Sequence, residues 1–337
     1  MPIEEHKSLK DYNTFKIDCT ARYFSSVDSI ESLKTALQSK VHPTTFILGG
    51  GSNLLLTKNI EALVLHINLK GIQLIDEDKS SVVLNVMAGE NWHDFVEFCI
   101  NNNYGGIENL SLIPGNVGTA PIQNIGAYGV ELKDVFINCN TISINDQSEK
   151  KFTKKECDFG YRNSIFKHEK KGDYIITSVN FKLTKINHKK MIDYGSIREE
   201  LKKHQIHSPS IKEISEAVIR IRKSKLPDPN ELGNSGSFFK NPVINNVEFK
   251  NFNENFPKAP YYKLSDTEYK IPAAWLIEKM GFKGKRFGDA GVHKNQALVL
   301  VNHGNATGKE ILTLAEKIQS KIKEEFGILI VPEVNVL

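Results

Sequence analysis

Residues 111–129 read SLIPGNVGTAPIQNIGAYG and contain four glycines among small and amide side chains, with no charged residue. Glycine allows φ > 0, and it lets main-chain N–H groups approach a ligand that a Cβ would hold away. Such a loop suits an anion held by main-chain donors, as a pyrophosphate is. Glycine also marks ordinary turns, so a plain connection between strands explains the spacing equally well.

A second glycine cluster lies in residues 45–56, TFILGGGSNLLL. Two apolar runs flank the glycines, and this pattern predicts a strand, an anion-binding turn and a second strand. Neither stretch contains the G-x-x-x-x-G-K-[ST] motif of a P-loop or a G-x-G-x-x-G motif opening a helix, which argues against both of those nucleotide sites. The two turns could instead hold the two halves of one long dinucleotide.

The composition is that of an ordinary globular protein. The chain has 337 residues, a net charge of +4, 40% apolar and 25% charged residues. Its length predicts about two to three domains. The basic residues are scattered, which favours small anionic ligands over nucleic acid. No apolar run has the length of a membrane span, and residues 1–10 lack the apolar core of a signal peptide, so we expect a cytoplasmic protein.

Cysteine and histidine spacing gives no sign of a metal site. The four cysteines form no C-x-x-C pair and are too sparse for a disulfide framework. The ten histidines form no H-x-H or H-x-x-x-H set. We therefore expect no bound metal and four small, buried thiols.

Apolar periodicity predicts alternating helices and strands in the first part of the chain. Helical spacing predicts helices over 29–40 and from Trp92 to Cys99, the second ended by the glycines at 105–106. Short apolar runs predict strands over 46–48, 62–67, 82–87, 135–144 and 174–183.

The last part of the chain carries two capping boxes, Ser210 with Glu213 and Thr307 with Glu310. The first opens a helix that ends in basic residues, which ordinarily complement the helix dipole. The second opens a long amphipathic helix that Gly327 ends. We also expect a helix over 272–280 and strands over 296–301 and 328–331.

Two polar side chains stand in turns that could carry chemistry. Arg162 lies in DFGYRNS at 158–164 and could clamp a carboxylate with both ends of its guanidinium, although an isolated arginine is as often simply solvated. Ser237 lies in GNSGSFFKNP at 233–242, where its hydroxyl could be held over an apolar pocket. A serine in such a turn also serves ordinary turn chemistry.

Two further candidates are Glu333 and Tyr194. Glu333 follows a proline between apolar neighbours near the C-terminus, where a carboxylate is costly unless it is used, although terminal residues often fray. Tyr194 stands beside Gly195 in a segment that could be mobile, and an amphipathic surface tyrosine is the simpler interpretation.

Taken together, these motifs resemble the UDP-N-acetylenolpyruvoylglucosamine reductase family. The resemblance runs in order from about residue 10 to the end, and its motifs are GGGSN, SLIPGNVGTAPIQNIGAYG, DFGYRNS, KLPDP, GNSGSFFKNP, AAWLIEKMGFKG, HKNQALVLVN and the terminal PEV. Tyr194 and the full region between Asn241 and Trp275 are similar to the first of the family's two structural types, which carries a tyrosine loop over the substrate.

The resemblance implies an α+β fold of the vanillyl-alcohol-oxidase-like FAD-binding kind. Two α/β subdomains would grip FAD, and a C-terminal α+β domain would bind substrate. We expect these parts at residues 1–70, 71–207 and 208–327, with 328–337 as a C-terminal strand returning to the active site.

The resemblance also implies the site. FAD would be bound without a covalent bond, by Gly49, Gly50, Gly51, Ser52, Asn53, Pro114, Gly115, Val117, Gly118, Ala120, Gln123, Asn124, Gly126, Ala127, Tyr128 and Gly129. Contacts to the UDP-sugar would come from Tyr161, Tyr194, Lys225, Asn241, Lys283 and Gln296. The catalytic residues would be Arg162, Ser237 and Glu333.

The implied reaction consumes NADPH in two half-reactions. NADPH would reduce FAD, and flavin N5 would pass hydride to the methylene carbon of the enolpyruvyl group. Arg162 and Glu333 would stand at the carboxylate, with Glu333 protonated or sharing a proton, while Ser237 would deliver a proton to the adjacent carbon. Asn335 and the pair Tyr261–Tyr262 receive no role from the resemblance.

Two other functions remain possible from the residues alone. An FAD-linked oxidase of another alcohol or sugar would keep the fold, but it would need no proton donor such as Ser237. A nucleotide-sugar-binding protein without catalytic activity would be colourless and would still bind UDP-sugars. We expect a monomer whose partners are small molecules, with no nucleic acid and no membrane.

Overall fold

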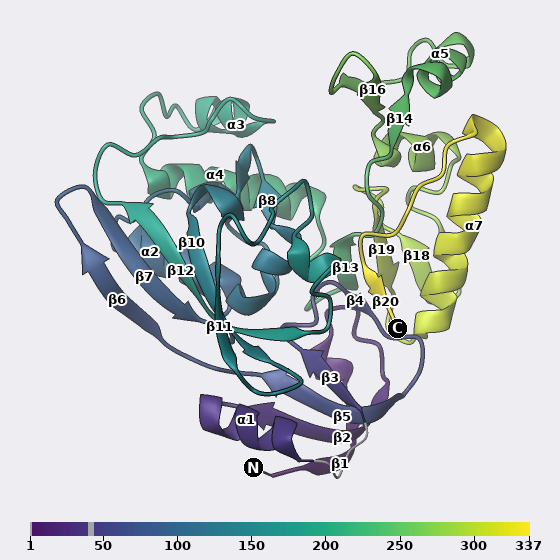
Figure 1. Cartoon of the computed structure of the whole chain (residues 1–337). Coiled ribbons are helices and arrows are strands. Elements are labelled where there is room, and N and C mark those ends of the chain that lie inside the picture. Colours follow the sequence, from purple (N-terminus) through teal and green to yellow (C-terminus); the bar gives the residue numbers. More distant parts are fainter. Residues whose placement is uncertain (1, 40–43) are drawn as a thin grey trace. The chain divides into compact units, whose positions relative to one another are not determined.

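The computed structural model describes residues 2–39 and 44–337 (Figure 1). The chain folds into two compact units. The first takes in the described residues of Met1–Lys7, Ala21–Gly50 and Ile60–Arg222; the second contains Ser8–Thr20, Gly51–Asn59 and Lys223–Leu337. The predicted domain limits at residues 70, 207 and 327 remain predictions.

The first unit begins with a four-stranded sheet of order β1-β2-β5-β3, in which β2 and β3 run parallel to β5. The strands are β1 Glu4–Ser8, β2 Thr20–Val27, β3 Thr45–Leu48 and β5 Ile60–Ile67. Helix α1 Ile30–Gln38 begins where Ser29 caps it and buries Leu33 and Ala36 in the same core cluster as residues of β5. The predicted helix over 29–40 is confirmed as far as the structure describes it; Lys40 lies outside the described residues.

A five-stranded antiparallel sheet, of order β11-β10-β12-β7-β6, forms the rest of the first unit's framework. Its core is aromatic, because Trp92 and Phe95 of α2 pack against Phe181 with ring centroids 6.0 and 4.9 Å away. The elements are β6 Ile72–Glu77, β7 Ser81–Met87, α2 Trp92–Asn101, β10 Phe136–Ser143, β11 Glu149–Thr153 and β12 Tyr174–Thr184. The strands predicted over 46–48, 62–67, 82–87, 135–144 and 174–183 are all confirmed.

Between α2 and β10 the chain forms short turns instead of long elements. Three 3₁₀ turns, Glu108–Leu110, Val117–Thr119 and Pro121–Gln123, lead to a small hairpin of β8 Gly126–Ala127 and β9 Val130–Glu131. Helices α3 Ile197–Lys203 and α4 Ile211–Lys225 follow later in the chain and share a core cluster. The predicted capping box of α4 is present, since Ser210 N donates to Glu213 Oε2 at 2.7 Å and Glu213 N donates to Ser210 Oγ at 3.3 Å.

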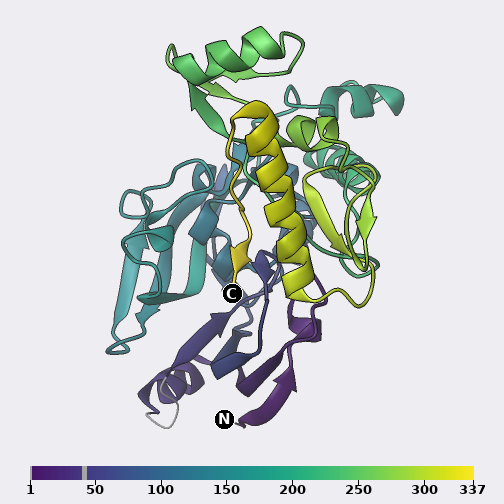
Figure 2. The same ribbon diagram turned by 90° about the vertical axis from the view of Figure 1, so that its right-hand side faces the viewer.

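The second unit is built on a sheet of order β13-β19-β18-β17, against which α7 packs. Figure 2 shows the last residues of the chain running back alongside α7. The elements are β13 Gly233–Ser237, β17 Arg286–Phe287, β18 Ala290–Val292, β19 Val299–Asn302 and α7 Gly308–Phe326. The capping box of Thr307 and the left-handed C-cap at Gly327, with φ 68°, are both present as predicted.

A small sheet of order β14-β16-β15 completes the second unit together with two short helices. Trp275 of α6 packs edge-on against Phe252 of α5 and lies 5.8 Å from the ring of Phe326 in α7. The bounds are β14 Val243–Asn245, α5 Asn246–Asn255, β15 Tyr262–Lys263, β16 Glu268–Lys270 and α6 Ala273–Lys279. The helix predicted over 272–280 is therefore confirmed.

Two strand predictions are wrong in part. Residues 328–331 form no strand, although Ile328 and Ile330 are buried and Leu329 is 56% exposed as in a strand. The Ile330 carbonyl accepts from the Gln319 side chain at 2.7 Å, and backbone pairing with residues 238–240 begins only at Val331, whose carbonyl oxygen accepts from Lys240 N at 3.0 Å. The terminal strand is instead β20 Asn335–Val336, which pairs in parallel with β4 Leu54–Leu55. The strand expected from residue 296 begins at Val299, because Val299 N donates to Gln296 O and closes a turn.

Candidate active site

The two glycine turns meet in the first unit. A Cβ added to Gly50 would lie 2.9 Å from Gly115 Cα and 2.8 Å from Asn116 Oδ1. A Cβ added to Gly49 would lie 2.4 Å from Thr119 Cγ2. Glycine is required here because any side chain would push the two turns apart.

Main-chain donors are available where the turns meet. Among residues 2–39 and 44–337, the N–H groups of Gly49, Gly50, Gly115 and Asn116 donate to no protein acceptor. All four residues are half-buried. Grouped main-chain donors of this kind form a concavity for an anion, so the residues present fit the pyrophosphate of a dinucleotide such as FAD.

Other residues of the 111–129 stretch serve the framework. Val117 N and Gly118 N donate to Glu90 O and Ala88 O, both at 2.9 Å. The Ala120 and Asn124 side chains are buried. The Asn124 amide bonds only protein groups in the part of the chain that the structure describes, namely Glu131, Lys133 and Gly160.

Arg162 lies beside this stretch in the first unit. Its Nη2 donates to the Gly126 carbonyl oxygen at 2.5 Å, and its guanidinium carbon lies 5.5 Å from the Tyr161 ring centroid. Its φ of 53° is left-handed, which is unusual for a residue with a side chain. Tyr194 reaches the same stretch from another segment, because a Cβ on Gly129 would lie 3.2 Å from Tyr194 Cβ. Tyr161 and Tyr194 are both exposed.

Arg222, at the end of the first unit, is a functional candidate that the sequence analysis missed. Its Nε is buried without a hydrogen-bond partner. Burial lowers the pKa of the Arg222 guanidinium; Tyr128 acts in the opposite direction, and the charge of Arg162 lowers that pKa further. Two neighbouring cations, one with an unpaired buried nitrogen, favour a bound anion.

The sequence does contain a pattern that indicates a buried position for Arg222. It follows Val218 by four residues, and Val218 belongs to the buried stripe of α4. A residue four positions further on lies on the same helix face, so this spacing could have placed Arg222 on the buried side of α4 and apart from the solvated basic residues of the helix end.

Ser237 and Glu333 come together in the second unit. Glu333 N donates to the Phe238 carbonyl oxygen at 2.7 Å, and Pro332 forms a bridge with Phe239. Asn53, from the glycine cluster at 45–56, donates its side-chain amide to the Glu333 carbonyl oxygen at 3.4 Å. Ser237 ends β13 and is exposed, while Glu333 is half-buried. The hydroxyl and the carboxyl thus lie on directly paired segments.

The remaining predicted substrate residues of the second unit have local partners or are exposed. Asn241 Oδ1 accepts from Ala273 N at 2.9 Å, at the start of α6. Lys283 pairs with Glu278 at 3.0 Å. Gln296 forms the turn before β19, the strand that pairs with Ser237, and Lys225 is exposed at the end of α4. No contact among the described residues joins these four side chains in one cluster.

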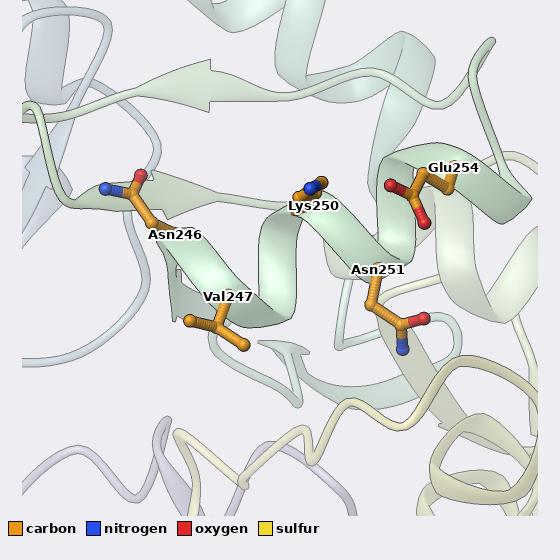
Figure 3. Close-up of a pocket in the computed structure, with 5 residues that line it drawn as sticks. All are labelled: Asn246, Val247, Lys250, Asn251 and Glu254. Atoms are coloured by element: carbon orange, nitrogen blue, oxygen red, sulfur yellow. The ribbon is translucent and has the colours of Figure 1, made fainter.

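A shallow hollow on α5 has no connection with these residues. Figure 3 shows that its five lining side chains all leave one helix; they are Asn246, Val247, Lys250, Asn251 and Glu254. Val247 is 80% exposed, so the hollow is an open helix face. Within the described ranges, no group of three or more metal-ligating side chains gathers, and no helix is long and apolar enough to cross a membrane.

Comparison with known proteins first defines the class. Residues 22–145 match the FAD binding domain family, so the chain is a flavoprotein of the α+β class, as predicted. Residues 228–337 match the family described as UDP-N-acetylenolpyruvoylglucosamine reductase, C-terminal domain.

Relatives and a solved structure carry the same name over the whole chain. The UDP-N-acetylenolpyruvoylglucosamine reductase of Flavobacterium johnsoniae is 59% identical over 337 residues, covering 100% of both chains, and that of Pseudomonas aeruginosa is 44% identical, covering 99% of both. The crystal structure of the Thermus caldophilus enzyme is 25% identical, with a TM-score of 0.69, covering 100% of this chain and 99% of that one. This chain belongs to the UDP-N-acetylenolpyruvoylglucosamine reductase family, which confirms the predicted family. It is an FAD-dependent oxidoreductase, and NADPH is the family's reductant.

Proposed function

We propose that this protein reduces UDP-N-acetylglucosamine enolpyruvate to UDP-N-acetylmuramate with NADPH, in peptidoglycan precursor synthesis. Family membership supports the reaction class. The observation that carries the proposal is the backbone pairing of Glu333 with Phe238, which places the segment that carries this carboxyl beside the residue that follows Ser237. An FAD-linked oxidase of a simple alcohol needs no such proton donor.

FAD would be held without a covalent bond. When bound, FAD supplies the two-electron relay between NADPH and the substrate. The free N–H groups of Gly49, Gly50, Gly115 and Asn116 support a pyrophosphate site. The other contacts of this proposal are Gly51, Ser52, Asn53, Pro114, Val117, Gly118, Ala120, Gln123, Gly126, Ala127, Tyr128 and Gly129.

Arg162 and Arg222 would hold the substrate's negative charge. Hydride addition to the methylene carbon leaves charge on the adjacent carbon, from where it spreads into the carboxylate. Cations fixed in advance at that place lower the barrier, because they need no reorganisation during the step. The bond from Arg162 to Gly126 O supports such fixing. The unpaired Nε of Arg222 supports a second contact to an anion.

Ser237 would donate its hydroxyl proton to the carbon next to the carboxylate. A positioned proton donor contributes roughly 10²- to 10⁴-fold to a rate. Glu333, protonated or sharing a proton, would also stabilise the charge on the carboxylate. The backbone pairing with Phe238 supports a fixed position for both groups.

The UDP-sugar would contact Tyr161, Tyr194, Lys225, Asn241, Lys283 and Gln296. Lys283 would have to exchange its Glu278 partner for a phosphate oxygen. We further propose a cytoplasmic monomer, with domain limits near residues 70, 207 and 327.

The test supplies purified holoenzyme with NADPH and the enolpyruvyl UDP-sugar, and it identifies the product by mass spectrometry. The proposal expects one NADPH consumed for each sugar and a product heavier by two hydrogen atoms. NADPH consumption that is independent of the sugar, with the sugar recovered unchanged, would overturn it.

A further inference from the structure

The turn that carries Arg162, residues 158–164, has an uncommon backbone. Asp158 and Arg162 adopt left-handed φ angles of 44° and 53°. Side-chain-bearing residues hold such conformations only where their surroundings fix them. The direction of the Arg162 guanidinium therefore depends on what anchors this turn.

Three side-chain anchors join the turn to residues 122–126 of the glycine-rich stretch. Asn124 Nδ2 donates to the Gly160 carbonyl oxygen at 3.1 Å. Ser164 Oγ donates to Ile122 O at 2.6 Å, and Arg162 Nη2 donates to Gly126 O. Of these, only the Asn124 bond holds the middle of the turn.

The Asn124 side chain has no hydrogen-bond donor left for another ligand. Its side chain is fully buried. The amide nitrogen also lies 3.1 Å from Glu131 Oε2, and its Oδ1 accepts from Lys133 N at 3.0 Å. An amide has two donors, and both have acceptors here. Its own φ of 43° is left-handed, a conformation that asparagine tolerates better than most residues.

We propose that Asn124 is a positioning residue for Arg162 and that its side chain makes no contact with the cofactor. Without its bond, the Gly160 carbonyl keeps its bond from Asn163 N within the turn but loses its anchor to the glycine-rich stretch, so the left-handed turn relaxes and the guanidinium moves. A displacement of about 1 Å away from the reacting groups can cost roughly 10²-fold in rate. This inference rests on the proposed role of Arg162 at the substrate carboxylate.

The experiment is a double-mutant cycle on the holoenzyme with Asn124→Gly and Arg162→Ala. Glycine accepts the left-handed φ without strain, so the variant removes only the side chain. We expect Asn124→Gly to slow flavin reoxidation by the enolpyruvyl sugar about 10- to 100-fold, with unchanged flavin content and unchanged reduction by NADPH. In the Arg162→Ala background, Asn124→Gly should cause no further fall in the reoxidation rate. Asn124→Asp, which keeps the acceptor for Lys133 N but loses both donors, should behave alike and serves if the glycine variant does not fold.

The matched control is Asn302→Gly in the second unit. Asn302 is also buried and also makes three hydrogen bonds, to Phe15 O, Gly304 N and Ala306 N. Any fall in the reoxidation rate that Asn302→Gly causes should multiply with the fall caused by Arg162→Ala. Losses of Asn124→Gly that multiply in the same way, or a fall in its flavin content, would overturn the inference. Wild-type reoxidation in Arg162→Ala alone would overturn the proposed role of Arg162 itself, and with it this inference.

Discussion

Glu333 donates its main-chain N–H to the Phe238 carbonyl oxygen at 2.7 Å, which ties a carboxyl four residues from the C-terminus to the residue that follows Ser237. This pairing is not frayed, because β20 anchors the chain beyond it on β4 and Asn53 holds the Glu333 carbonyl. A terminal carboxyl so fixed can act in a site that a loose chain end could not serve.

Ser237→Ala tests the proton donor. The change removes only a hydroxyl from an exposed position, so stability should hardly change. Flavin reduction by NADPH should be unaffected, whereas reoxidation by the enolpyruvyl sugar should slow by roughly 10² to 10⁴. Stopped-flow absorbance separates the two half-reactions, with Ser265→Ala, another exposed serine of the second unit, as the control. Equal losses in both half-reactions would remove the proton-donor role.

Arg222→Met should separate stability from activity. Methionine keeps much of the apolar stem but removes a charge whose Nε is buried without a partner. Relief of an uncompensated buried charge stabilises the ligand-free protein, so we expect a Tm higher by about 2–4 °C for each kcal/mol gained. Turnover should fall at the same time, since the anion loses a contact. Thermal melts and kcat/KM of Arg222→Met are compared with those of Lys223→Met, a change at the exposed neighbouring residue. A lower Tm with full turnover in Arg222→Met would contradict this interpretation.

Gly50→Ala should release the flavin. The new Cβ would meet Gly115 Cα at 2.9 Å, which forces the two glycine turns apart. The ratio of flavin absorbance to protein in the purified variant should drop severalfold, while the fold is kept. The control is Gly172→Ala, because a Cβ there meets no atom within 4 Å, although its φ of 83° strains any side chain. A full flavin complement in Gly50→Ala would show that the meeting of the turns does not form the cofactor site.

Glu213→Gln should remove an acid-sensitive part of the stability. Hydrogen bonds from the Ser210 main chain and hydroxyl lower the pKa of the Glu213 carboxyl below its ordinary value of 4.5. A carboxyl with a depressed folded-state pKa stabilises the fold above its unfolded pKa, and this contribution is lost as the pH falls through the folded value. The wild type should therefore have a higher Tm than the variant at neutral pH, and the difference should vanish in acid. A difference that grows on acidification would contradict the assignment.

The sequence predicted best what local chemistry determines. The helices α4 and α7 begin at their capping boxes and, like α2, follow an apolar stripe, because caps and periodicity act within a few residues. The strand prediction at 328–331 failed because pairing is a tertiary property. Ile328 and Ile330 alternate with exposed neighbours as in a strand, but the backbone pairs with residues 238–240 only from Val331 onward, and the Ile330 carbonyl accepts from the Gln319 side chain instead.

The candidate site also contains parts that the sequence could predict and parts that it could not. The glycine turns were predictable as turns, whereas their meeting depends on contacts between distant segments, such as Gly50 with Gly115. Arg222 could have been found from its place on the buried stripe of α4. Asn124 could not, because only the folded structure reveals that Glu131 and Gly160 take both of its amide donors and that Lys133 N donates to its oxygen.

The most direct test of the central claim is an anaerobic absorbance record of the purified protein, first with NADPH and then with the enolpyruvyl UDP-sugar. The account predicts that the visible band of oxidised flavin bleaches with NADPH and returns when the sugar is added. A band that bleaches and does not return would contradict the proposed substrate, and a protein that shows no flavin band even after reconstitution with FAD would contradict the proposed cofactor site.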